Sequence, residues 1–202
     1  MRNRSFIWLL ASLLVSCTRS SQEQIPFNSD LNIQIDGQFG SSEWSQPQIL
    51  ELTPHNFLYL IHDEDYLYIG INNQEQVGRY VDLYLFNESM GIINLHASMQ
   101  LGERELVGNW NDTIPKWNWG NQKNWMANTV EVVNEDEDLT FLESVRPYEG
   151  HEFRISKEKI QRSDLKMWIE VKDFMGQAND IIFPANSDPV KTETWFPVEM
   201  GK

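Results

Sequence analysis

Apolar and polar residues alternate with a period of two along much of the chain. Val81, Leu83 and Leu85 alternate with polar or aromatic residues, and similar alternation marks residues 93–99 and 165–172. This period is typical of β-strands that bury one face and expose the other. The strands that it predicts cover residues 32–35, 57–62, 66–72, 80–85, 93–99, 129–133, 150–155 and 165–171.

Turn residues between these runs predict antiparallel connections. Asp63-Glu64-Asp65 separates two apolar runs and indicates a hairpin with an acidic turn. One short helix is expected at residues 156–160, with Ser156 as its N-cap. Together these elements predict an all-β fold, an antiparallel β-sandwich of the jelly-roll or immunoglobulin-like type.

A tryptophan-rich segment at residues 108–128 has no clean period and predicts a long loop. It carries Trp110, Trp117, Trp119 and Trp125, and long loops in compact domains are often functional. Trp125 directly precedes a strand and is expected in the core. For the other three, two interpretations stay open: the rings bind a ligand, or the loop folds over a sheet face and buries it.

Polar and aromatic residues on the outward side of the predicted strands supply the other candidate site residues. If Val81, Leu83 and Leu85 point inward, Asp82 and Tyr84 point outward, and neighbouring strands add further side chains. Aromatic rings beside amide and carboxylate groups suit a sugar, whose C–H faces stack on rings and whose hydroxyls take directional hydrogen bonds. The predicted ligand-binding set is Trp110, Trp117, Trp119, Tyr84, Asp82, Asn94, His96 and Trp168.

The N-terminus resembles a bacterial lipoprotein signal. Arg2 and Arg4 precede a short apolar run that ends at Cys17, the single cysteine of the chain. The resemblance implies removal of residues 1–16, lipidation of Cys17, a tether over residues 17–30, and a sandwich domain over residues 31–202. It also implies a bacterial cell envelope protein on a lipid anchor. Because Thr18 is not an aspartate, similarity to enteric lipoproteins points to the outer membrane.

Charge and motifs exclude several classes of function. The net charge of −14 argues against nucleic acid and against broad contact with anionic lipid. The sequence contains no Gly-x-Ser-x-Gly, no His-Glu-x-x-His and no phosphate-binding glycine loop, so we expect a protein that is not an enzyme.

The opening of the domain carries a more specific motif. Ile35-Asp36-Gly37 precedes Glu43-Trp44, the run Tyr66-Leu67-Tyr68-Ile69-Gly70-Ile71 follows an acidic turn, and Trp195-Phe196-Pro197 lies near the end. This combination resembles the family 9 carbohydrate-binding modules and their DOMON-like relatives. The resemblance implies a β-sandwich that binds carbohydrate, often with structural calcium. From the residues themselves, Asp36-Gly37 predicts a turn with positive φ at the glycine, and Trp44 a core plug at one end of the sandwich.

Alternatives to sugar binding stay open at this point. One is an interaction lipoprotein that docks on another envelope protein through the same face. Another is a haem-binding DOMON-like domain, in which His96 would need a partner such as Met90 or Met167. No cofactor is expected; the weak candidates for a calcium ion are Asp63 and Asp65, in a turn that is otherwise a solvated hairpin tip.

Overall fold

The computed structural model describes residues 24–73, 79–106, 115–120, 122–133, 144–160, 164–173 and 179–201. The expected signal segment, Cys17, Trp110 and the acidic stretch at residues 134–138 lie outside this part of the chain. Among the described residues, no helix is long and apolar enough to cross a membrane.

The described elements are strands, apart from one short α-helix and one 3-10 turn. They are β1 (Gln48–Thr53), β2 (Asn56–His62), β3 (Tyr66–Asn73), β4 (Arg79–Asn87), β5 (Gly91–Ala97), β6 (Leu101–Leu106), β7 (Asn118–Trp119), β8 (Trp125–Ala127), β9 (Gly150–Ser156), α2 (Lys157–Ile160), β10 (Lys166–Asp173), β11 (Ile181–Phe183), η1 (Thr192–Thr194) and β12 (Phe196–Pro197).

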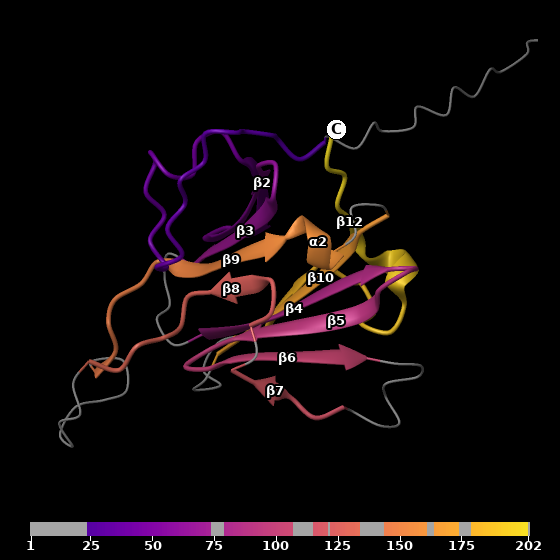
Figure 1. Cartoon of the computed structure of the whole chain (residues 1–202). Coiled ribbons are helices and arrows are strands. Elements are labelled where there is room, and N and C mark those ends of the chain that lie inside the picture. Colours follow the sequence, from indigo (N-terminus) through magenta and orange to yellow (C-terminus); the bar gives the residue numbers. More distant parts are fainter. Residues whose placement is uncertain are drawn as a thin grey trace, which may run out of the picture.

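The strands form two antiparallel sheets, which confirms the predicted β-sandwich. One sheet has the order β1-β2-β3-β9-β8. The other has the order β11-β10-β4-β5-β6-β7, with β12 paired to β10. In Figure 1, β2, β3, β9 and β8 occupy the upper part of the molecule, and β4, β5, β6 and β7 the lower part.

The aliphatic side of each alternating strand faces the space between the sheets. This core excludes water almost completely, and each large side chain buried there contributes about 1.5–3 kcal/mol. Its fully buried members include Leu58, Leu60, Leu67, Ile69 and Phe153 from the first sheet, and Leu83, Leu85, Leu95, Met167 and Ile169 from the second. Trp125 belongs to this core, as predicted.

The outer face of the five-stranded sheet is covered by residues 31–44. Trp44 stacks on Phe39 with ring centroids 5.6 Å apart, and both rings lie over Gly70 of β3. A Cβ atom at Gly70 would lie 2.6 Å from Phe39 and 2.8 Å from Trp44. Trp44 is therefore buried as predicted, but it covers a sheet face and does not close one end of the sandwich.

Glu152 of β9 fixes this covering segment. Its carboxylate accepts hydrogen bonds from Trp44 Nε1 at 2.7 Å, from the Gly37 backbone N–H at 2.7 Å and from the Asp36 backbone N–H at 3.0 Å. Gly37 has φ +83°, which confirms the predicted turn. Burial raises the pKa of Glu152 to about 7, although the three donors oppose that shift.

Three local predictions were wrong. Residues 32–35 do not pair in a sheet but pack on the outer face with the covering segment. At residues 129–133 only an isolated bridge forms, between Val132 and Val145, and β5 ends at Ala97, so that Met99 is exposed. Ile25, which lies within the expected tether, is buried in the core and forms a bridge with Met200.

Candidate functional site

One row of side chains runs straight across the outer face of the second sheet. Strand register places Glu170 of β10 opposite Asp82 of β4, Asp82 opposite His96 of β5, His96 opposite Gly102 of β6, and Gly102 opposite Trp119 of β7. Neighbouring strands are about 4.8 Å apart, so the row spans about 19 Å. Sequence alternation predicted the outward direction of Asp82 and His96, and the register confirms that they lie side by side.

His96 and Asp82 form the polar centre of the row. His96 Nδ1 donates a hydrogen bond to Asp82 Oδ1 at 2.9 Å, and both side chains are largely buried. The bond leaves Nε2 as the other polar atom of the imidazole. Aromatic rings surround His96, with centroids at 5.4 Å for Tyr80, 5.2 Å for Trp117 and 5.6 Å for Trp119.

Trp117 and Trp119 form a ring pair at the edge of the sheet. Their centroids are 5.3 Å apart, and Trp119 is 49% exposed, whereas Trp117 is half-buried. Gly102 makes room for them, because a Cβ atom there would lie 2.7 Å from the Trp119 ring and 3.2 Å from the Trp117 ring. Trp119 therefore packs against Trp117 and Gly102 on one side, and about half of its surface is open to solvent.

Arg104 connects this ring pair to the next row of the sheet. Its guanidinium lies over the Trp117 ring, 4.0 Å from the centroid, and its Nε donates a hydrogen bond to Asn94 Oδ1 at 2.8 Å. It also forms a hydrogen bond with Tyr84. Burial raises the pKa of the Tyr84 phenol, and the bond with Arg104 opposes that shift. Asn94 is fully buried, so its role is to hold Arg104 in place.

The other half of this face is covered by the C-terminal segment. Trp195 packs on Tyr84 and on Trp168 of β10, with centroids 6.2 Å and 6.5 Å apart, and Trp168 Nε1 donates to Ser187 Oγ at 2.8 Å. Trp168 is only 2% exposed. The cover over this half is therefore residues 187–195, not the tryptophan-rich loop considered above.

The structure brings most of the predicted ligand-binding residues together, but some of them are covered by other side chains. Asp82, His96, Trp117 and Trp119 meet on one patch, with Asn94 directly behind it. Tyr84 and Trp168 point to the same side of the sheet, as predicted, but lie beneath Trp195. Trp110 is outside the described residues. We call the four meeting residues, with Arg104, the aromatic patch.

Two residues of this region were not predicted from the sequence. Gly102 and Arg104 lie on β6, whose run Leu101–Leu106 is interrupted by charges on both faces and so shows no clear alternation. The pairing of Glu170 with Lys172, at 3.0 Å, was also missed, although both residues stand on the polar side of an alternating strand. Register, and not local pattern, brings these groups to the patch.

Asp63, one of the two calcium candidates, holds the hairpin turn through its carboxylate. Asp63 Oδ1 accepts hydrogen bonds from the backbone N–H groups of Asp65 and Tyr66 at 2.8 Å and 2.6 Å, and Oδ2 accepts one from Tyr68 at 2.9 Å. These bonds give the Asp63 carboxylate a structural role in the turn. In the described part of the chain, no cluster of three or more His, Cys, Asp or Glu residues could hold a metal ion.

The haem partner considered for His96 does not fit the sheet. Met167 is fully buried between the sheets, whereas His96 stands on the outer face, so the two cannot bind one iron. Met90 packs against the same core, at the turn after β4.

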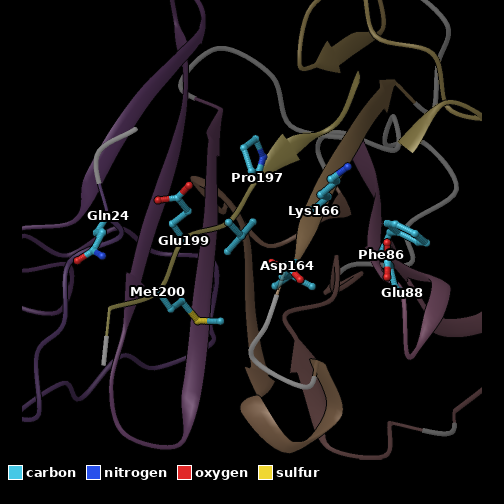
Figure 2. Close-up of a pocket in the computed structure, with 10 residues that line it drawn as sticks. Gln24, Phe86, Glu88, Asp164, Lys166, Pro197, Glu199 and Met200 are labelled. Atoms are coloured by element: carbon cyan, nitrogen blue, oxygen red, sulfur yellow. The ribbon is translucent and has the colours of Figure 1, made fainter. Parts of the chain in front are cut away.

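A separate cavity of about 580 Å³ lies where the two terminal segments meet. Figure 2 shows Gln24, Glu199 and Met200 on one side of it and Phe86 and Glu88 on the other. None of the predicted site residues lines this cavity, which distinguishes it from the aromatic patch.

Comparisons with known proteins give one structural likeness. No protein-family model matches the chain, and no curated protein matches it. The chain is similar to a family 9 carbohydrate-binding module from Caldicellulosiruptor kristjanssonii, solved in complex with cellotriose, with a TM-score of 0.49 and 11% sequence identity. The match covers 88% of this chain and 94% of that chain.

Proposed function

We propose that the aromatic patch binds carbohydrate without catalysing a reaction. The observation that carries this proposal is the half-exposed Trp119, supported by Trp117 and Gly102 and placed beside the His96–Asp82 pair. An exposed indole next to directional polar groups matches both parts of a sugar, the apolar ring face and the hydroxyl rim.

Four residues of the patch have assigned roles in this binding. Trp119 stacks on a pyranose ring, and Trp117 packs against Trp119 and keeps its ring in place. Asp82 fixes the orientation of His96, whose Nε2 then forms a hydrogen bond with a hydroxyl group. Because register on a rigid sheet fixes these groups, little conformational entropy is lost on binding.

The envelope location and the lipid anchor are part of the same proposal. They rest on the sequence around Cys17 and on the resemblance to lipoprotein signals. Tyr84 and Trp168 are left out of the proposed contact set, because Trp195 covers them. Trp110 stays in the set as a prediction from sequence.

The test is a panel of oligosaccharides titrated by calorimetry against wild type and two alanine variants. Trp119→Ala removes the exposed ring and should weaken binding about tenfold, since ring stacking contributes up to about 1.5 kcal/mol in addition to the apolar area that it buries. Phe27→Ala is the matched control, because Phe27 is 53% exposed and lies outside the patch. It should leave the affinity unchanged.

Two results would contradict the proposal. One is the absence of binding to any neutral or charged oligosaccharide of the panel by folded wild type. The other is equal affinity in Trp119→Ala and wild type. If a second envelope protein binds at Trp119 and no oligosaccharide of the panel does, the patch is a docking surface.

A further inference from the structure

Arg104 is a cation of the patch whose partners among the described residues are all neutral groups. Its guanidinium contacts the Trp117 ring, Asn94 Oδ1 and Tyr84. Among the described residues it forms no ion pair. In a chain with 30 acidic and 16 basic residues, a half-buried arginine without a carboxylate is unexpected.

Among the described residues, the carboxylates near Arg104 either bond another group or stand on the opposite side of β6. Asp82 bonds His96 at 2.9 Å, and Glu170 bonds Lys172 at 3.0 Å. Glu103, next to Arg104 in sequence, faces the opposite side of β6, where it accepts hydrogen bonds from Lys159 and Trp125, each at 2.7 Å. Glu105 stands on that opposite side as well.

The guanidinium of Arg104 is chemically suited to bind a carboxylate. A guanidinium has five N–H donors in a planar fork, and that fork matches the two oxygens of a carboxylate. Nε donates a hydrogen bond to Asn94. Each other nitrogen of the Arg104 guanidinium either has a partner or is accessible to solvent. Arg104 and Trp119 both contact Trp117, at 4.0 Å and 5.3 Å from its ring centroid, so an oligosaccharide that extends from Trp119 across Trp117 reaches the guanidinium.

We propose that the carbohydrate bound by the aromatic patch is acidic, a glycan containing uronic acid whose carboxylate is bound by Arg104. This inference rests on the proposed function and names its substrate class. The net charge of −14 repels long polyanions, so recognition depends on the local contact at Arg104 and is clearest with short oligosaccharides.

The experiment compares a short oligogalacturonide with its methyl ester, which has the same sugar ring without the charge. Wild type should bind the free acid about tenfold more tightly than the ester, because hydrogen bonds to a charged group are about twice as strong as neutral ones. Arg104→Gln should abolish that preference, and Arg104→Lys should keep only part of it, since lysine lacks the fork.

Arg146→Gln is the matched control, because Arg146 is an exposed cation paired with Glu131 outside the patch. It should preserve the preference for the acid. Thermal unfolding of each variant, together with its affinity for the ester, shows whether the patch is still folded.

Three outcomes would overturn the inference. The acid and the ester bind wild type equally, or Arg104→Gln weakens both by the same factor, which would mean that Arg104 only supports Trp117. Tighter binding of a sulfated oligosaccharide than of the uronide would exclude uronic acid as the ligand. If neither acid nor ester binds and Trp119→Ala has no effect, it is the carbohydrate proposal itself that fails.

Discussion

At the scale of single residues, Glu152 and His151 are adjacent on β9 and serve opposite faces of the sheet. Glu152 is fully buried beneath the covering segment, whereas His151 faces inward and lies 2.9 Å from the Arg79 carbonyl through Nε2. Burial raises the pKa of Glu152 to about 7 and lowers the pKa of His151 to about 4. The two groups therefore affect stability in opposite directions with pH.

Glu152 should make the protein less stable as pH rises from about 4.5 to about 7. Its pKa in the folded chain is above the ordinary glutamate value of about 4.5, so the folded state binds more protons than the unfolded state in this range. The free energy of unfolding of wild type minus that of Glu152→Gln should fall by about 3 kcal/mol over this range. Urea unfolding at several pH values measures it.

The subtraction removes the contribution of His151, which is common to both proteins and acts with the opposite sign. Glu152→Gln should also be less stable than wild type at low pH, because an amide offers fewer acceptor sites to the three N–H donors. A difference that stays constant or grows with pH would contradict the assignment.

At the scale of elements, two strands depend on a glycine that lets an aromatic ring approach the sheet. Gly70 of β3 lies beneath Phe39 and Trp44, and Gly102 of β6 lies beneath Trp117 and Trp119. Neither has a positive φ, so alanine fits the backbone at both positions, and the cost of substitution is steric. One glycine positions the cover and the other positions the patch.

Gly102→Ala should weaken carbohydrate binding about tenfold with little loss of fold. The new methyl group would meet the Trp119 ring at 2.7 Å, and that ring is exposed enough to move away from its binding position. Calorimetric titration with far-UV circular dichroism checks both parts. Gly40→Ala is the control, because its Cβ would meet nothing closer than 3.7 Å; unchanged affinity in Gly102→Ala would contradict the role of Gly102.

The fold was predictable where alternation is regular, and the site only in part. The alternation of Leu83 and Leu85 with Asp82 and Tyr84 predicted which face of β4 lies in the core and which faces outward. The position of Trp195 over Tyr84 could not be predicted, because it depends on a contact between residues more than a hundred positions apart. Gly102 and Arg104 were missed for a similar reason: cross-strand register gives them their neighbours.

At the scale of the whole molecule, the terminal segments and the patch lie on opposite sides. The Ile25 backbone N–H donates to the Glu199 carbonyl at 2.8 Å, so the first described residues lie beside the C-terminus. Figure 1 shows this junction at the top of the molecule and β7, which carries Trp119, at the bottom. A chain anchored ahead of Gln24 would thus present the patch away from its attachment.

Cys17→Ser should release the protein from membranes. The thiol is the atom that lipidation needs, and serine keeps the side-chain size without it. After cell fractionation, wild type should sediment with membranes, and the variant should not, with equal carbohydrate affinity for both. Sedimentation of the variant with membranes would contradict the lipid anchor while leaving the proposal for the patch intact.

The most direct test of the central claim is to follow indole N–H signals by NMR while an oligosaccharide is added. The indole groups of Trp44, Trp125, Trp168 and Trp195 are engaged inside the protein. The account predicts that the signals of Trp117 and Trp119 shift in proportion to bound sugar while these four stay in place. Shifts confined to the buried four, or none at saturating sugar, would contradict it.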